Sequence, residues 1–330
     1  ASRRAARAAG RNPPTLYEVD YLLNVNDEAR LGALRFAESE GGPFLASGEQ
    51  MPVPPLVDLP ALLEASEQVL DDNKSGEYLR LLLAPGSSLG GARPKASVRD
   101  TEQQLSIAKF PHKNDEIDAV RWEAVALSLA ERAAIPVPTW SVESVNDRPV
   151  LLLKRFDREA GHRVPFVSAM SMLGADDREQ RSYLELVDIL RQHGATPVED
   201  MHALWRRIVF SVLISNTDDH LRNHGFLYVP QSGWSLSPAY DMNPVPIDLK
   251  PRVLSTMIDL EDATASYELA LSVAPYFELD DNEARTIGAE VAAAVADWRA
   301  VAQSLGITAA ETERMASAFE HADQDLAKGG

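Results

Sequence analysis

Asp218, Asn223 and Asp241 are side chains whose types and order suit phosphoryl transfer. The first two lie in the run S-N-T-D-D-H-L-R-N-H-G-F-L-Y at residues 215–228, with Asn223 five positions after Asp218. Protein kinases use a loop Asp to accept the substrate hydroxyl proton, an Asn five residues later to bind Mg²⁺, and a further downstream Asp to bind Mg²⁺. The spacing therefore favours a phosphotransferase with Asp218 as the base and Asn223 and Asp241 as Mg²⁺ ligands.

A metal-dependent hydrolase is the competing interpretation of the same stretch. His220 and His224, together with Asp218, Asp219 and Asp241, could ligate Zn²⁺ or Mn²⁺. The stretch lacks H-E-x-x-H spacing, and the interval from the first Asp to the Asn favours the oxygen ligands that Mg²⁺ prefers. His220 could contact a phosphate or simply brace the loop backbone.

A small-residue loop at residues 85–95, P-G-S-S-L-G-G-A-R-P-K, could bring backbone N–H groups close to phosphate oxygens. Glycine allows such an approach because it has no Cβ. Gly90, Gly91 and Ala92, with Lys95, form its centre, but the Walker A spacing is absent. A plain turn between strands is the simpler interpretation.

Two further segments carry candidate nucleotide contacts. Lys109 lies in the strand-like I-A-K-F at 107–110, and Glu123 follows on the next helix, as in the Lys–Glu pair of kinases. The alternative is an exposed Lys and a solvated Glu. Residues Lys154 to Arg158 close an apolar strand, and their backbone could face a purine edge. The alternative there is a basic strand end.

The elements that must position these residues fall into two groups. Apolar patterning predicts strands at 105–110, 137–145 and 149–156, and helices at 59–70 and 115–134. After Ser168 it predicts long helices near 178–193, 198–215, 282–304 and 308–326. Segregation of this kind predicts an α+β protein with two lobes and a ligand site in the cleft between them.

Composition narrows the class of protein. The 330-residue chain has a net charge of -18, which argues against a broad surface for nucleic acid or anionic membranes. It contains no cysteine, so disulfides, thiolate metal sites and Cys nucleophiles are excluded, as suits a reducing cytoplasm. No apolar run reaches the roughly 18 residues of a membrane span. The chain begins at Ala1 without Met, and we expect a truncated N-terminus.

Several motifs in order resemble the HipA family of serine/threonine kinases, the toxins of HipA–HipB toxin–antitoxin systems. They are D-E-A-R-L-G-A-L-R-F (27–36), S-S-L-G-G-A-R-P-K, A-K-F, L-K-R-F-D-R, N-T-D-D-H-L-R-N and S-P-A-Y-D. The resemblance implies a bilobal protein-kinase-like fold with a mixed strand and helix N-lobe at 76–157 and an all-helical C-lobe at 158–330. Residues 1–75 would be the remnant of an N-terminal subdomain and its linker.

The resemblance also implies roles for residues. Asp218 would be catalytic, Asn223 and Asp241 would hold Mg²⁺, Glu123 would pair with Lys109, and Ser88 would be autophosphorylated to inactivate the enzyme. The implied ATP contacts are Gly90, Gly91, Ala92, Arg93, Lys95, Lys109, Lys154, Arg155, Phe156, His220, Arg222, Asn223, Tyr240 and Asp241. Two positions depart from the family pattern: Asp219 replaces a small residue and Arg222 replaces a Lys.

The partners that the resemblance implies are a HipB-like DNA-binding antitoxin, operator DNA through that complex, and a translation component such as an aminoacyl-tRNA synthetase. Phosphorylation of that component would halt growth and produce persistence in the bacterial cytoplasm. Two other functions remain open. One is a small-molecule kinase of the aminoglycoside or choline type, and the other is a catalytically silent co-repressor subunit.

Overall fold

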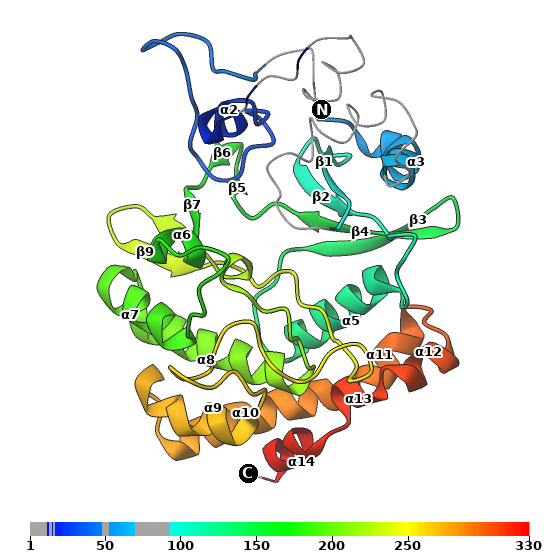
Figure 1. The fold of residues 1–330 in the computed structure, drawn as a ribbon, viewed down its shortest axis with the longest axis vertical. Coiled ribbons are helices and arrows are strands. Elements are labelled where there is room, and N and C mark those ends of the chain that lie inside the picture. The colour runs from blue at the N-terminus through cyan, green and yellow to red at the C-terminus, as the bar shows by residue number, and fades with distance from the viewer. Residues whose placement is uncertain (1–11, 13–14, 16, 48–52, 70–92, 330) are drawn as a thin grey trace. The chain divides into compact units, whose positions relative to one another are not determined.

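The computed structural model describes residues 12, 15, 17–47, 53–69 and 93–329 (Figure 1). The chain divides into two compact units, which are described separately. The first comprises residues 1–116 and 139–164, and the second comprises residues 117–138 and 165–330.

The first unit is built on an antiparallel four-stranded sheet in the order β1-β2-β4-β3. Its strands are β1 (Lys95–Arg99), β2 (Leu105–Lys109), β3 (Trp140–Val145) and β4 (Arg148–Lys154). The turn between β3 and β4 places Asn146 and Asp147 at φ 48° and 59°. Both residue types tolerate this left-handed conformation, which a tight hairpin of twisted strands requires.

Helix α3 (Leu59–Val69) covers one face of this sheet. Its apolar side, Leu59, Leu62 and Leu63, packs in one buried cluster with Ala96, Val98, Ala108 and Leu152. The short elements α2 (Glu18–Leu23), η1 (Leu56–Asp58), β5 (Arg158–Glu159) and β6 (His162–Arg163) complete the unit. The strands predicted at 105–110, 137–145 and 149–156 and the helix predicted at 59–70 are all present.

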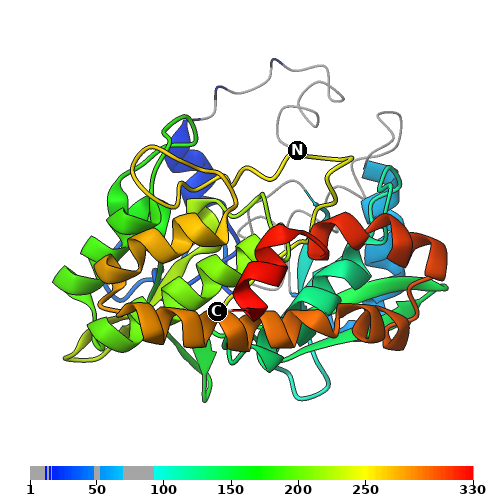
Figure 2. The same ribbon diagram turned by 90° about the horizontal axis from the view of Figure 1, so that it is seen from below.

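The second unit is organised around helix α8 (Pro197–Leu213). The helix is apolar on all sides near its C-terminal end, and Leu204, Trp205, Ile208 and Val212 are fully buried. Around it lie α5 (Ala119–Arg132), α6 (Ala169–Leu173), α7 (Tyr183–His193), α9 (Tyr267–Val273), η3 (Ala274–Phe277), α10 (Asp281–Ala296), α11 (Trp298–Ser304), α12 (Ala309–Arg314), α13 (Ala316–Phe319) and α14 (Ala322–Lys328). Helices α8 and α10 run beside each other in both Figure 1 and Figure 2.

Helix α5 belongs to this second unit although the sequence suggested a boundary at residue 157. The reason is an aromatic cluster. The ring of Trp122 lies 6.2 Å from that of Trp298 and 6.0 Å from that of Phe319, and the latter two rings are stacked. Such contacts fix α5 to α11 and α13.

The prediction that the C-terminal half is all-helical is wrong. The second unit contains an antiparallel sheet of β7 (Phe166–Ser168), β8 (Gly225–Val229) and β9 (Gly233–Leu236). Tyr228 on β8 is paired with Trp234 on β9, their rings 5.4 Å apart. Cross-strand aromatic pairs stabilise such short hairpins. Within the described part of the chain, no helix is both long and apolar enough to cross a membrane.

Candidate active site

A tight loop after helix α8 carries the predicted catalytic residues. Ser215 has a φ of 51°, which turns the chain sharply as the helix ends. The backbone N–H of His220 donates to the carbonyl of Asp218 at 2.9 Å, and that of Asn223 donates to the carbonyl of His220 at 2.8 Å. The short helix η2 (Leu221–Asn223) follows, and β8 begins after one further residue, His224. The loop is therefore held at both ends by packed elements.

Asp218 and Asn223 are brought together within this loop. The Asn223 side chain donates from Nδ2 to the Asp218 carbonyl at 3.1 Å, and it is buried. The Asp218 carboxylate instead remains 58% exposed, with the Lys250 Nζ atom 3.6 Å from its Oδ1 atom. The Asp218 carboxylate is therefore accessible from solvent on a backbone that the loop holds in place.

Asp241 lies on a segment that runs beside the loop. Two contacts bracket it. The Tyr240 hydroxyl donates to the Arg222 carbonyl at 2.8 Å, and the Asn243 N–H donates to the Asn216 Oδ1 atom at 3.2 Å. Asp241 itself has a φ of 60°, an uncommon conformation for a residue other than glycine. Such outliers persist where the surrounding contacts enforce them, and they gather at functional sites.

The donor set suits Mg²⁺. Asn223 and Asp241 offer an amide oxygen and a carboxylate, which are hard ligands, and Mg²⁺ is commonly held by one or two such groups plus water and substrate phosphates. Because Asn223 uses its Nδ2 atom on the Asp218 carbonyl, its side-chain orientation is fixed. Among the described residues, no group of three or more His, Cys, Asp or Glu side chains could hold a metal ion.

Asp219 points the opposite way from its neighbour, into the protein. Its Oδ2 atom accepts from the Tyr183 hydroxyl at 2.6 Å and from the Ser211 hydroxyl at 3.1 Å. The His224 Nε2 atom lies 3.0 Å from its Oδ1 atom, and the Thr256 hydroxyl donates to its backbone carbonyl at 2.7 Å. This one side chain therefore ties the loop to helices α7 and α8 and to the start of β8.

The electrostatics beneath the loop agree with this role. Burial alone would raise the pKa of Asp219, but the nearby His224 and the donated hydrogen bonds hold that pKa below its usual range. Burial and the Asp219 charge raise the pKa of Tyr183 well above its usual value, so its hydroxyl remains a donor. Burial lowers the pKa of Arg207 to about 10, and the Asp219 charge opposes this shift.

The remaining predicted residues of the second unit have varied surroundings. Arg222 is exposed and forms an ion pair with Asp177. His220 is half-buried, and its backbone contributes to the loop hydrogen bonds. Burial raises the pKa of Tyr240, which keeps its hydroxyl protonated for the bond to the Arg222 carbonyl.

The first unit holds the other predicted contacts. Lys95 and Lys109 are directly opposite each other in the β1–β2 register, and Lys109 is buried. The Arg93 guanidinium lies 2.9 Å from the Asp115 carboxylate. The N–H groups of Lys154 and Arg155 donate to the carbonyls of Thr139 and Leu105, so they are already used within the unit.

Some predicted residues cannot be compared with the structure. Ser88, Gly90, Gly91 and Ala92 lie outside the described residues. Lys109 and Glu123 are both buried, but they belong to different units, and their pairing stays a prediction.

The sequence did not identify Lys250 as a neighbour of Asp218, because it lies 32 positions away in an irregular segment.

Comparison with known proteins gives a consistent result. Residues 87–322 match the family described as HipA-like C-terminal domain. A Haemophilus influenzae protein named "Putative kinase" is 31% identical over 178 residues, which are 47% of this chain and 52% of that protein. Y4mE of Sinorhizobium fredii, with the same description, is 26% identical over 147 residues, covering 41% of this chain and 33% of that protein. The matches therefore span about half or less of these relatives.

Two solved structures share the fold. The HipA, HipB and operator DNA complex of the Shewanella oneidensis toxin–antitoxin system aligns with a TM-score of 0.61 and 17% identity, covering 87% of this chain and 73% of that chain. The Helicobacter pylori proinflammatory kinase CtkA aligns with a TM-score of 0.55 and 15% identity, covering 71% of this chain and 93% of that chain. The mixed α and β fold is thus confirmed as similar to these two proteins.

Proposed function

We propose that this chain, which belongs to the HipA-like C-terminal domain family, is an ATP-dependent kinase that phosphorylates serine or threonine hydroxyls of a protein. The observation that supports this most strongly is the loop at residues 215–223. There the exposed Asp218 carboxylate, the fixed Asn223 amide and the neighbouring Asp241 segment lie together. The names of the curated relatives agree with a kinase.

The residues would divide the reaction as follows. Asp218 accepts the proton of the attacking hydroxyl as the new O–P bond forms, while the bond from the γ-phosphorus to the β–γ bridging oxygen breaks and ADP leaves. Asn223 and Asp241 would hold Mg²⁺, which supplies positive charge to the transferring phosphoryl group. The buried Asp219 fixes the backbone that carries Asp218, so that the base is positioned before the substrate binds.

Contacts from the first unit belong to the same proposal. Lys109 would contact the nucleotide phosphates, and the Gly-rich segment with Arg93 and Lys95 would approach them through the backbone. Since the N–H groups of Lys154 and Arg155 are engaged with protein carbonyls, adenine recognition at 154–156 would use carbonyl groups or Phe156. Substituting Lys109 or Phe156 singly tests these contacts by the affinity for ATP.

The partners are proposed on the basis of the family. The Shewanella neighbour is a HipA in complex with HipB and operator DNA. We infer a HipB-like antitoxin and an operator DNA for this chain, with a translation component such as an aminoacyl-tRNA synthetase as substrate and inhibition of growth as the result. Ser88 is the proposed site of self-inactivating phosphorylation, because a phosphate of about -1.5 to -2 charge opposes ATP phosphates in the same loop.

The proposal is tested by transfer from ATP labelled on the γ-phosphate. Purified chain, Mg²⁺ and labelled ATP are incubated with aminoacyl-tRNA synthetases and their tRNAs, with Asp218→Asn as the matched control. We expect the natural chain to place label on serine or threonine of one protein, and Asp218→Asn to place none. Label on aminoglycosides or choline instead would establish a small-molecule kinase. ATP binding without any transfer would establish a silent subunit.

A further inference from the structure

A cationic pocket in the first unit shares only Arg155 with the residues proposed to contact ATP. Its volume is about 510 Å³, within the range of small-ligand sites. It is lined by Glu28, Arg99, Glu102, Gln103, Gln104, Leu105, Arg155, Arg158, Ala160, Gly161 and Arg163. It lies at the Arg99–Leu105 end of the β1–β2 pair, four register steps from the Lys95–Lys109 end. That separation is about 13 Å along the strands.

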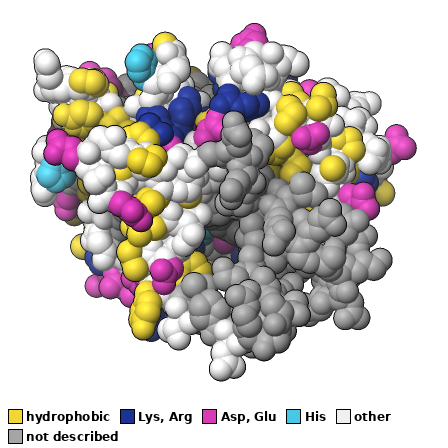
Figure 3. All heavy atoms as spheres, turned by 90° about the horizontal axis from the view of Figure 1, so that it is seen from above, with side chains coloured by type: hydrophobic (Ala, Val, Ile, Leu, Met, Phe, Trp, Pro, Cys, Tyr) yellow, Lys and Arg dark blue, Asp and Glu magenta, His cyan; other side chains and the backbone are white. Residues whose placement is uncertain are grey.

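The charge of this pocket is opposite to that of the whole chain. Four arginines and two glutamates line it, in a chain whose net charge is -18. Figure 3 shows lysine and arginine side chains gathered in one strip on the face that it displays, with acidic side chains beside them. A concentrated cationic site on an acidic protein attracts small anions selectively, because the rest of the surface repels them.

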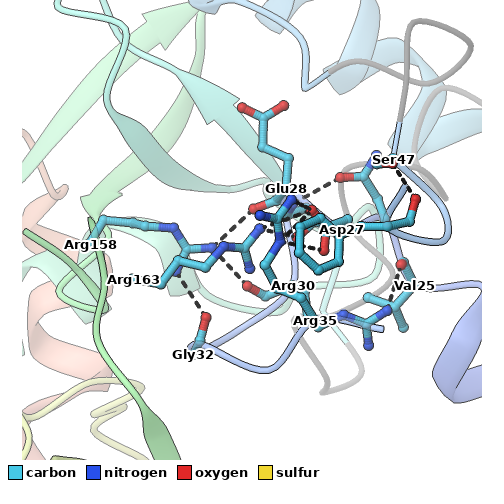
Figure 4. Close-up of polar contacts among 12 residues, drawn as sticks. Val25, Asp27, Glu28, Arg30, Gly32, Arg35, Ser47, Arg158 and Arg163 are labelled. Atoms are coloured by element: carbon cyan, nitrogen blue, oxygen red, sulfur yellow. Dashed lines mark hydrogen bonds and ion pairs between the residues drawn. The ribbon is translucent and has the colours of Figure 1, made fainter. Parts of the chain in front are cut away.

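Part of this arginine cluster has a structural role. Arg155 donates from all three of its guanidinium nitrogens, to Asp157 and to the carbonyls of Ala29 and Arg30. Arg158 donates from Nη2 to the carbonyls of Glu28 and Arg30, and Figure 4 shows it reaching towards this backbone. These bonds hold the segment around residues 27–32 against the end of β4.

The hydrogen bonds of Arg155 and Arg158 to the backbone of residues 28–32 form a clamp. This clamp does not use every guanidinium donor of the arginine cluster. Arg158 uses only its Nη atoms, and Arg163 uses only Nη2, which donates to the Asp27 carbonyl at 2.6 Å. Among the described residues, the hydrogen bonds of Arg99 and Arg158 involve their Nη atoms, and the Nη1 atom of Arg163 is buried without a hydrogen-bond partner. Arg99 instead uses its Nη atoms on Glu28 and on the Gln103 carbonyl.

The arginines also crowd one another. Burial lowers the pKa of Arg158 to about 10, and Arg155 and Arg163 lower it further although Asp157 opposes them. The pKa of Arg163 is likewise lowered, first by burial, while the charges of Asp27 and Asp157 oppose the shift and those of Arg35 and Arg155 add to it. With four arginines and two glutamates in its lining, the pocket carries a net positive charge that a bound anion would balance.

We propose that this pocket binds a tetrahedral phosphate-class oxyanion, held by the guanidinium groups of Arg99 and Arg158, with Arg163 adding positive charge to the lining. Guanidinium groups match phosphate oxygens in charge and geometry, and such charge-assisted bonds are the strong ones. Glu28 limits the affinity, since it occupies Arg99 and adds negative charge at the rim. The ligand is inorganic phosphate or the phosphate group of a monoester, and the two share this chemistry.

Titration of the full chain with inorganic phosphate, followed by calorimetry at fixed ionic strength, tests the proposal. The Arg99 and Glu28 side chains are 32% and 36% exposed, and neither side chain belongs to the clamp, so Arg99→Gln and Glu28→Gln preserve the fold. We expect Arg99→Gln to weaken phosphate binding about tenfold. Glu28→Gln should tighten it about threefold, because a competing charge is removed. Changes of opposite sign from two neighbouring side chains exclude a purely structural role.

Two further binding experiments are needed. One separates the pocket from the proposed nucleotide site, and the other identifies the ligand. Phosphate binding should persist when a non-hydrolysable ATP analogue is present at saturation. Phosphoserine binding more tightly than phosphate would assign a monoester, and the reverse order would assign the free ion. Absence of phosphate binding, equal affinity in both variants and the natural chain, or loss of binding with the analogue would each overturn the proposal. None of these outcomes depends on kinase activity.

Discussion

Asp218 and Asp219 are adjacent in the sequence, and their carboxylates have opposite surroundings. Asp218 is exposed beside Lys250, whereas Asp219 is buried among Tyr183, Ser211 and His224. A charged group at that depth is retained only where hydrogen bonds and opposite charges compensate for its desolvation. The inner carboxylate therefore anchors the loop, and the outer one is left available for chemistry.

Replacing Asp219 by Asn should separate these two roles. The neutral amide keeps the size of the side chain but cannot accept as many hydrogen bonds, so the loop carrying Asp218 shifts. We expect kcat to fall about 10- to 100-fold, as for a misplaced catalytic group, while KM for ATP stays close to its original value. Steady-state kinetics with each substrate varied would measure this difference.

Tyr183→Phe is the matched control for that variant. It removes a single hydrogen bond to the same carboxylate and leaves the charge in place, so kcat should fall less than in Asp219→Asn. The loss of folding stability should be about 1–3 kcal/mol. If Asp219→Asn changed KM for ATP and left kcat intact, the anchoring role would be wrong.

At the scale of elements, strand β8 connects the loop to the small sheet of the second unit. Gly225 begins this strand directly after His224 and pairs with Ser168 on β7. A Cβ atom added at Gly225 would collide with the ring of Phe166. Glycine is therefore required here by the close approach of a side chain on the neighbouring strand.

Gly225→Ala should consequently displace β8 and the loop that precedes it. We expect a loss of about 1–3 kcal/mol in folding stability, typical of overpacking, together with reduced kinase activity. Adding Phe166→Leu should recover part of both, because the smaller side chain makes room for the new methyl group. Thermal unfolding and kinase rates of the single and double variants would measure this. Failure of the double variant to recover either property would contradict the explanation.

Much of this element level was predictable from the sequence, and the exceptions have physical causes. Long periodic segments such as α3, α5 and α8 are where expected, since an apolar face of several turns is a strong signal. In the sheet β7-β8-β9 only the short apolar run at residues 226–228 is strand-like in the sequence, and the other strands were missed because strands of three to five residues carry little periodicity. The predicted helix at 282–304 is interrupted between Ala296 and Trp298, where the chain begins a separate helix.

The candidate site was predicted in part for similar reasons. The spacing of Asp218, Asn223 and Asp241 is a property of the sequence, and the structure brings their segments together. The inward direction of Asp219 was not predictable, because it depends on a tyrosine 36 residues away. The roles of all these residues stay predictions until they are measured.

At the scale of the whole molecule, His321 links the stability of the second unit to pH. Burial lowers the pKa of His321 to about 4, and the Arg252 charge adds to this although Asp323 opposes it. The unfolded chain binds that proton near pH 6.5. Between pH 6.5 and about 4 the unfolded state thus holds more protons than the folded one, and folding stability falls as the pH falls.

Removing this imidazole should flatten the pH dependence. Between pH 6.5 and 4, the unfolding free energy of His321→Gln should change less steeply with pH than that of the natural chain. We expect the slope to be smaller by up to about 1.4 kcal/mol per pH unit. Chemical denaturation at several pH values would measure it. His193→Gln, at an exposed helix end, is the control and should leave the slope unchanged. An unaltered slope in His321→Gln would contradict the buried neutral histidine.

The central claim, phosphoryl transfer with Asp218 as the base, is tested most directly by intact-mass spectrometry after incubation with Mg²⁺ and ATP. The natural chain should gain the mass of one phosphoryl group, located at Ser88. Asp218→Asn should gain none while still binding ATP, and Ser88→Ala should gain none while still transferring phosphate to a protein substrate. A phosphoryl group gained equally by the natural chain and Asp218→Asn would contradict the assignment of the base.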